Sequence, residues 1–172
     1  EFRTLASAAH RGCFGKSSGG YGAMRMGMAY PDTWGAIANH SGDANFDFVY
    51  GAEWPAVLTH LQNFAKPQLK TGKQSVTPQS VPGEDDGRVK RFLTYVAETP
   101  PNGERPLSNS DVMTLMLLAM AATYDPDPAA PNDFYVPYDL CTGERIEARW
   151  RQWLKHDPVN MVRASARRLA KL

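Results

Sequence analysis

The chain has 172 residues, enough for one domain that buries about 70% of the surface that its unfolded form exposes. Hydrophobic residues make up 42% and charged residues 22%, which is ordinary for a soluble globular protein. The net charge of +1 gives no electrostatic case for nucleic acid or an anionic membrane as a partner. The longest apolar run, 112–122, is too short to span a bilayer. Since no secretory signal is visible, we expect a soluble, cytoplasmic protein, whose oligomeric state the sequence leaves open.

The first predicted element is a strand over 11–14, which leads directly into the run Gly15–Gly20. This run reads G-x-S-x-G-G, the pattern of a nucleophile elbow, a tight strand-to-helix turn that holds a serine above a parallel sheet. A serine hydroxyl is a weak nucleophile, so it must project freely toward a base. Glycines two positions before and after the serine let neighbouring backbones crowd the turn. We therefore predict Ser17 as the nucleophile, and the backbone N–H of Ser18 as a donor to the oxyanion.

A helix is predicted after the elbow, and a second strand after that helix. Gly20, Ala23 and Gly27 recur at spacings of three and four residues and give the helix one smooth face that can approach a sheet. Pro31 ends the helix, and the apolar run 34–39 predicts the next strand. These elements form a β–turn–α–β unit within residues 1–45.

Two other interpretations of the glycine-rich run remain. The run can be a glycine loop that contains a serine and has no chemistry. Gly15-Lys16-Ser17 also matches the end of a phosphate-binding loop, G-x-x-x-x-G-K-[ST]. The first glycine of that pattern would have to stand at position 10, where the sequence has His10, so we do not favour nucleotide binding.

Residues 46–139 read as a lid-like insertion. A helix is predicted over 54–64, a polar surface excursion over 68–90, and an extended loop over 124–139. Between them, Ser108 or Ser110 can cap a helix over 111–123 that is apolar almost all round and must be covered. The methionines of this helix suit either a gap-filling core or an adaptable acyl pocket.

Residues 140–172 predict two further helices. The first runs over 144–155 and carries Trp150 and Trp153; the second begins with Asp157 as its cap and Pro158 in its first turn. The second helix has an apolar stripe of Val159, Val162, Ala166 and Leu169, and a basic side of Arg163, Arg167, Arg168 and Lys171. We expect this basic side to face solvent rather than nucleic acid. Cys13 and Cys141 are expected to be separate thiols, with no metal cluster.

The segment 11–24 resembles the elbow region of the esterase D-like family of α/β hydrolases, and Tyr30–Asp32 and Ser41-Gly42 fit the same family. Near the end of the chain, 153–162 is similar to the segment before the strand that bears the catalytic acid. The resemblance implies a partial α/β-hydrolase fold, a parallel sheet with flanking helices and a lid-like insertion. It also implies hydrolysis of small or medium acyl esters through an acyl-serine, with a small-molecule ester as partner and no metal or organic cofactor.

The catalytic triad of this fold follows the order Ser, Asp or Glu, His. Sixteen residues precede Ser17, too few for the early strands, and the chain ends where a helix should lead to the next strand. We therefore expect an internal fragment of a longer hydrolase, with the acid, the base and one oxyanion donor outside it. The alternative is a triad within the chain, formed by Asp43 with His156.

The remaining histidines, His10, His40 and His60, are weaker candidates for the base. Two other functions stay open. One is a non-catalytic binding module, which Lys16 beside the serine and the incomplete triad favour. The other is acyl transfer to an alcohol through the same serine.

Overall fold

The computed structural model describes residues 4–66, 85–100 and 106–169. The chain divides into two compact units. Glu1–Val49 and Leu154–Leu172 form the elbow unit, and Tyr50–Trp153 form the helical unit.

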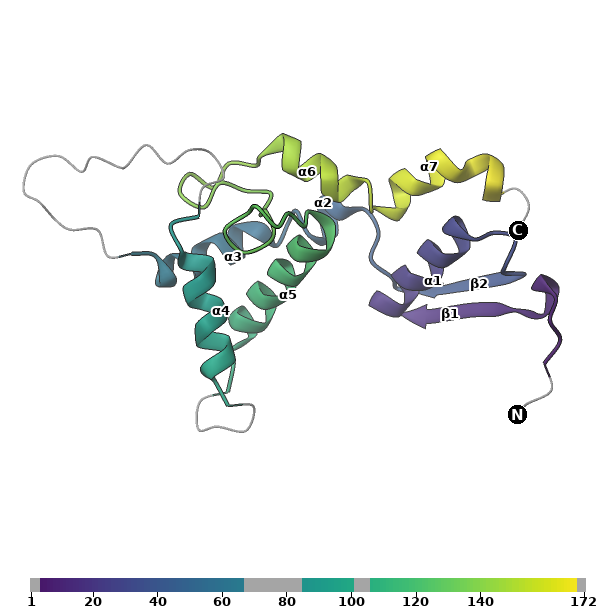
Figure 1. The fold of residues 1–172 in the computed structure, drawn as a ribbon, viewed down its shortest axis with the longest axis horizontal. Coiled ribbons are helices and arrows are strands. Elements are labelled where there is room, and N and C mark those ends of the chain that lie inside the picture. The colour runs from purple at the N-terminus through teal and green to yellow at the C-terminus, as the bar shows by residue number, and fades with distance from the viewer. Residues whose placement is uncertain (1–3, 67–84, 101–105, 170–172) are drawn as a thin grey trace, which may run out of the picture. The chain divides into compact units, whose positions relative to one another are not determined.

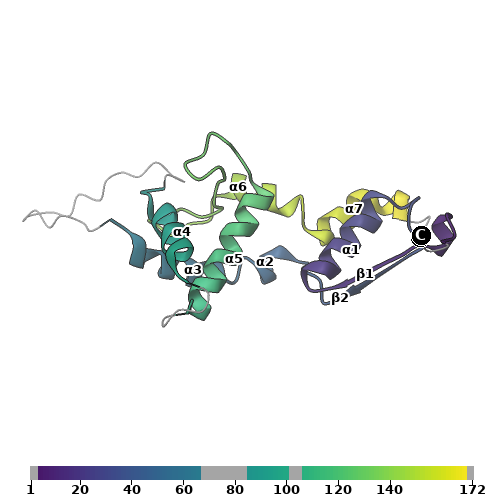
Figure 2. The ribbon, with the colours of Figure 1, turned by 60° about the horizontal axis from the view of Figure 1, so that its bottom comes forward.

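The elbow unit contains a parallel β–α–β arrangement (Figures 1 and 2). Strand β1 (Gly12–Lys16) leads through Ser17 into helix α1 (Ser18–Ala29), and strand β2 (Ala36–His40) follows. The two strands pair in parallel along their full length, first residue opposite first residue. The fold is thus mixed α/β, with a two-stranded parallel sheet and flanking helices. A 3-10 turn, η1 (Ala8–His10), precedes the sheet.

Helix α1 packs against the sheet through small residues. Gly20, Ala23 and Gly27 are all buried. A Cβ added to Gly27 would lie 2.6 Å from the Ile37 side chain on β2, and one added to Gly20 would lie 2.3 Å from Oδ1 of Asn39. The predicted smooth face is therefore confirmed, because larger side chains would hold the helix away from β2.

The opposite face of the sheet is open within the described residues. Exposed and half-buried residues alternate along β1, and Phe14 is 81% exposed. Ala38, its partner on β2, is also exposed. Parallel sheets are ordinarily covered on both faces, so this apolar surface is unusual.

Helix α7 (Pro158–Leu169) packs against α1. As predicted, Asp157 caps it: the carboxylate accepts a hydrogen bond from the Val159 N–H at 3.0 Å. Helix α2 (Phe46–Val49) follows β2 in the same unit.

The described members of the apolar stripe expected on α7, Val159, Val162 and Ala166, are not buried. Val159 and Val162 are 41% and 42% exposed, whereas Pro158 is buried and Met161 is half-buried. The packed residues of α7 thus differ from the predicted stripe, since helical spacing alone does not select which apolar face meets a neighbour. Arg163 is exposed, as expected. The side chains of 167–169 and residue 171 lie outside the described residues.

The helical unit is made of the elements that Figure 1 labels α3 to α6. They are α3 (Trp54–Leu61) with the 3-10 turn η2 (Gln62–Phe64), α4 (Arg88–Glu98), α5 (Asn109–Tyr124) and α6 (Glu147–Leu154).

The helices predicted over 54–64, 111–123 and 144–155 are all present, with α6 shorter than expected. Arg145 forms an isolated antiparallel bridge with Tyr138, which keeps the segment before α6 extended. Most of the excursion expected over 68–90 lies outside the described residues. The expectation was wrong for its last three residues, which form the first turn of α4.

Aromatic side chains fill the centre of the helical unit. The ring of Trp153, which is fully buried, lies 5.3–5.8 Å between centroids from four others: Tyr50, Trp54, Tyr124 and Trp150. Such pairs add to the stabilisation from apolar burial. The two tryptophans of α6 therefore belong to the core of the helical unit, which spans Tyr50–Trp153.

Helix α5 is capped by Ser108, one of the two predicted candidates. Its hydroxyl accepts from the Asp111 N–H at 3.1 Å, and Asp111 Oδ2 accepts from the Ser108 N–H at 2.8 Å, a complete capping box. The expected cover of this helix is confirmed on one face, where Leu117 and Leu118 are buried, but not on the other, where Val112 is 54% and Met116 is 37% exposed.

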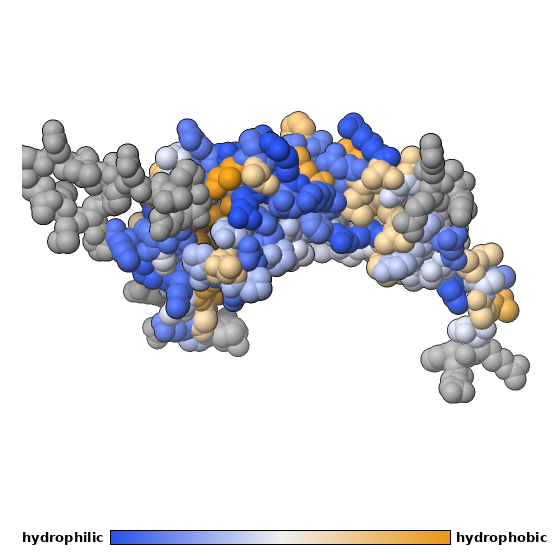
Figure 3. Space-filling model, turned by 45° about the horizontal axis from the view of Figure 1, so that its top comes forward, coloured by the Kyte–Doolittle hydropathy of each residue, from blue (hydrophilic) through white to orange (hydrophobic). Residues whose placement is uncertain are grey.

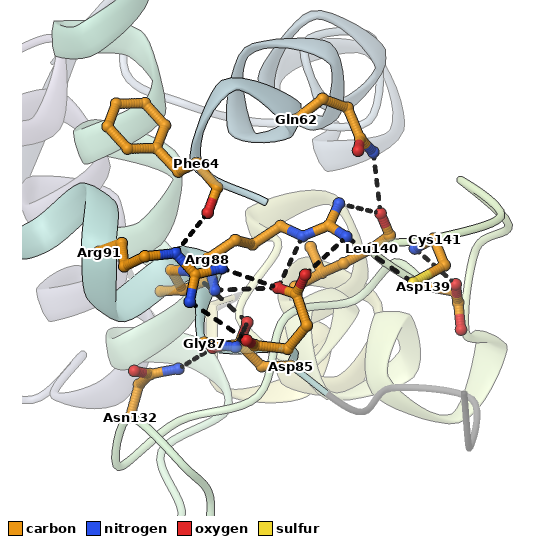
Figure 4. Close-up of polar contacts among 12 residues, drawn as sticks. Gln62, Phe64, Asp85, Gly87, Arg88, Arg91, Asn132, Asp139, Leu140 and Cys141 are labelled. Atoms are coloured by element: carbon orange, nitrogen blue, oxygen red, sulfur yellow. Dashed lines mark hydrogen bonds and ion pairs between the residues drawn. The ribbon is translucent and has the colours of Figure 1, made fainter. Parts of the chain in front are cut away.

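Arg88 ties α4 to the segment before α6 (Figure 4). Its guanidinium is buried, donates to Asp86 at 2.9 Å and also donates to the Leu140 carbonyl. Gln62 donates to the same carbonyl at 3.1 Å. Burial by itself would raise the pKa of Asp86, but the hydrogen bonds and charge of Arg88 outweigh it and lower that pKa. The hydrogen bonds from Arg88 and Gln62 to the Leu140 carbonyl connect parts of the helical unit that are distant in sequence.

Candidate active site

Ser17 lies at the corner between β1 and α1 with φ 55° and ψ −125°. Its N–H donates to the His40 carbonyl at 2.9 Å, and its carbonyl accepts from the Tyr21 N–H at 3.0 Å. The first bond ties the corner to the end of β2, and the second starts the helix. A non-glycine residue in this backbone region is uncommon and strained.

The glycines around Ser17 allow the tight turn. A Cβ added to Gly15 would lie 2.2 Å from the backbone of Gly19. On the other side, a Cβ added to Gly42 would lie 2.3 Å from the Tyr21 nitrogen. Because these contacts are with backbone atoms, a larger residue would force the turn open.

Positive φ angles gather at this end of the sheet. Besides Ser17, Ser41 has φ 50° and Asn45 has φ 60°, and both follow β2. Lys16 and His40 are the paired last residues of the two strands, so the corner lies at their carboxyl ends. Ligands bind at this edge of open parallel sheets, and strained residues concentrate at functional sites.

Ser18 is the first residue of α1. The first N–H groups of a helix have no partner within it, and they lie at the positive end of the helix dipole. An oxygen that gains negative charge beside Ser17 would meet such a donor.

His156, the alternative base within the chain, faces a cation. Its Nδ1 lies 2.7 Å from Nη1 of Arg25, and its carbonyl accepts from the Tyr21 hydroxyl at 3.1 Å. Burial, and then the charges of Arg25 and Lys155, lower its pKa. A triad histidine needs a carboxylate on this nitrogen, because its protonated form must be stabilised. The guanidinium does the opposite, so the geometry speaks against His156 as the base.

The other histidines have different surroundings. His60 lies 2.9 Å from Asp111 within the helical unit, and His10 lies 2.6 Å from the Ser7 hydroxyl on the surface. His40 is exposed at the end of β2, and Asp43 is half-buried beyond it. Among the residues that the structure describes, no histidine is hydrogen-bonded to the Ser17 hydroxyl.

The helix predicted over 111–123, whose methionines suited either a gap-filling core or an acyl pocket, borders a small cavity. A cavity of about 160 Å³ lies between α3 and α5. Met113 is the methionine of α5 that lines it, together with Ala56, Val57, Asn109, Ser110 and Thr114.

The second role of Asp157 was not predicted. Besides capping α7, its carboxylate accepts from the N–H groups of Asn45 at 3.0 Å and of Phe46 at 2.9 Å. The cap signal Asp-Pro is visible in the sequence, but these partners lie more than 100 positions away. No local pattern could have identified them.

None of the helices that the structure describes is long and apolar enough to cross a membrane. Comparison with protein-family models gave no match to this chain, and comparison with curated proteins gave none either.

Proposed function

We propose that this chain carries the nucleophile of a serine carboxylic-ester hydrolase on the α/β-hydrolase fold, acting on small or medium acyl esters. The observation that supports this most is the backbone of Ser17, with φ 55° and ψ −125° between a parallel strand and a helix. A glycine loop without chemistry has no need of serine here, because glycine adopts positive φ without a steric cost. A strained residue that carries a hydroxyl fits a nucleophile.

In the proposed reaction, the Ser17 oxygen attacks the ester carbonyl carbon while its proton passes to a base. The carbonyl oxygen becomes an oxyanion, to which the Ser18 N–H donates. When the intermediate collapses, the bond to the alcohol oxygen breaks and the alcohol leaves with the proton. Water then attacks the acyl-serine in the same way, which releases the carboxylic acid and restores the hydroxyl.

The base in this proposal is a histidine oriented by a carboxylate. No described histidine is bonded to Ser17, and Arg25 makes His156 unsuitable. We therefore propose that both groups come from residues other than those the structure describes. The resemblance in the elbow region implies the same division of roles.

Covalent labelling of the full-length protein tests the proposal. A fluorophosphonate probe should modify Ser17, as peptide mass spectrometry would show, and Ser17→Ala should abolish both the labelling and the hydrolysis of p-nitrophenyl acetate. Ser165→Ala, which removes a hydroxyl from α7, should leave both intact. Normal hydrolysis by Ser17→Ala would refute the proposal.

A binding module without catalysis is the second candidate. It is favoured by the absence, in the described residues, of a hydrogen bond between a histidine and the Ser17 hydroxyl. A folded full-length protein whose Ser17 resists the probe would support this candidate. If the serine is labelled, product analysis with competing alcohols would separate hydrolysis from acyl transfer.

A further inference from the structure

Residues 39–46 form the wall beside Ser17, and four sets of contacts hold them. The His40 carbonyl accepts from the Ser17 N–H at 2.9 Å. The Asn39 side chain accepts from the Gly42 N–H at 2.7 Å. The backbone of Gly42 lies directly against the first turn of α1. At its far end, the wall is bonded to the Asp157 carboxylate.

Asp157 has the properties of an anchor. It is only 3% exposed. One carboxylate oxygen accepts from the N–H groups of Asn45 and Val159, each at 3.0 Å, and the other accepts from Phe46 at 2.9 Å. A carboxylate held by several backbone donors fixes the segments it joins, because charge-assisted hydrogen bonds are strong and directional.

The wall is strained where it is held. Ser41 and Asn45 have φ values of 50° and 60°, a region in which residues with a Cβ are uncommon. Such conformations persist only when surrounding contacts impose them. The hydrogen bonds that Asn45 and Phe46 donate to Asp157 hold the backbone at Asn45. The hydrogen bond from the Gly42 N–H to the Asn39 side chain holds the backbone at Ser41.

A second connection runs from the same place to α1. The carbonyl of His156 accepts from the Tyr21 hydroxyl at 3.1 Å, and the Tyr21 N–H in turn donates to the Ser17 carbonyl. Residues 156 and 157 therefore contact both sides of the corner that holds the serine.

We propose that Asp157 is a positioning residue, which holds the wall of residues 39–46 against the elbow and so keeps Ser17 in its reactive geometry. This inference rests on the proposed function. Misplacement of reacting groups by about 1 Å can slow a reaction by about a hundredfold. Loss of the anchor should therefore lower the rate at which Ser17 reacts, while the fold of the elbow unit remains.

The test uses Asp157→Asn in the full-length protein. The amide keeps one acceptor oxygen but loses the other, so one N–H of the wall or the cap loses its partner. We expect the rate constant for fluorophosphonate labelling of Ser17 to fall at least tenfold. Amide exchange at Asn45 and Phe46 should accelerate, while the exchange of α1 amides stays unchanged.

Asp139→Asn is the matched control. Asp139 is also a buried carboxylate that accepts from two backbone N–H groups, those of Cys141 and Thr142, but in the helical unit. It should lower stability while leaving the labelling rate within about twofold. Equal loss of labelling in both variants would overturn the inference, since it would indicate a general effect of stability.

The two proposals fail in different ways. If wild-type Ser17 is labelled and Asp157→Asn is labelled at the same rate, the positioning role is refuted and the proposed function stands. If wild-type Ser17 is not labelled, the proposed function fails, and the positioning role fails with it. Should Asp157→Asn not fold, Asp157→Glu provides the second variant. It keeps the charge but displaces the oxygens, and it should label slowly; normal labelling would overturn the inference.

Discussion

Ser17 keeps a positive φ although it has a Cβ, and its neighbours explain how the chain tolerates this conformation. The residues that crowd the turn are glycines, and a Cβ at Gly15 would meet backbone atoms rather than a flexible side chain. Backbone cannot move aside without changing the corner itself. The steric requirement at Gly15 is therefore strict, whereas that at Gly22, on the same helix as Gly19 and Gly20, is not.

Gly15→Ala and Gly22→Ala form a matched pair. The added Cβ at Gly15 would lie 2.2 Å from the backbone of Gly19, so we expect a loss of about 1–3 kcal/mol in the free energy of unfolding. A Cβ added to Gly22 would meet no atom within 4 Å. Because alanine has a higher helix propensity than glycine, Gly22→Ala should raise the free energy of unfolding by up to about 1 kcal/mol. Urea unfolding measures both. Equal effects would contradict the tight corner.

At the scale of elements, capping side chains determine where α5 and α7 begin. At the start of α5, the side chains of Ser108 and Asp111 each accept a hydrogen bond from the other's backbone N–H. At the start of α7, the Asp157 carboxylate accepts one from the Val159 N–H. Such caps satisfy N–H groups that the helix cannot satisfy. Removing a cap should therefore lower the free energy of unfolding without disturbing the packing of the helix faces.

Ser108→Ala should lower the free energy of unfolding by about 1 kcal/mol, because the Asp111 N–H loses its acceptor. Ser110→Ala is the control, since Ser110 was the other candidate cap but lies exposed inside the first turn. Its effect should stay within about 0.5 kcal/mol. Thermal unfolding of the two variants compares them directly, and a larger effect at Ser110 would contradict the assigned cap.

Asp111 should make stability depend on pH. Burial would raise its pKa, but hydrogen bonds from the side chain and backbone of Ser108, together with His60, lower it. A lowered pKa in the folded state means that the unfolded state binds more protons near the ordinary value of about 3.9. Asp111 thus stabilises the fold above about pH 4, and this contribution disappears as pH falls through the folded-state pKa.

Urea unfolding between pH 5 and the acid limit of folding tests this. The difference in stability between wild type and Asp111→Asn should shrink as the pH falls. A difference that stays constant or grows would show that the carboxylate charge has no role in the cap.

At the scale of the whole molecule, two kinds of core coexist. The elbow unit packs glycine and alanine of α1 against a strand, whereas the helical unit packs large aromatic rings. On the face drawn in Figure 3, hydrophilic residues predominate and hydrophobic residues form separate patches. Phe14 is 81% exposed, and its strand partner Ala38 is exposed beside it. Single exposed apolar residues are common on protein surfaces, whereas adjacent ones form a patch.

Trp153→Ala should act mainly on the helical unit. The side chain is fully buried among aromatic rings, so its loss should cost about 3–5 kcal/mol. Hydrogen exchange should show lost protection in α3, α5 and α6, and little change in α1 and the two strands. Equal loss in α1 would indicate that the two units unfold together.

The sequence by itself was sufficient to identify the β–α–β unit, the smooth face of α1 and the cap at Asp157, and it limited the cap of α5 to Ser108 or Ser110. These features depend on neighbours within a few positions, where glycine, proline and polar side chains act locally. The position and backbone of Ser17 belong to the same class, since the glycine pattern is local.

Tertiary structure alone decided which apolar faces are covered and which distant groups meet. The exposed side of α7, the partial exposure of α5, and the second role of Asp157 depend on residues far away along the chain. The inclusion of α6 in the aromatic core has the same origin. A period of 3.6 residues shows that a helix has an apolar stripe, but not what lies against it, because packing partners are chosen by three-dimensional fit.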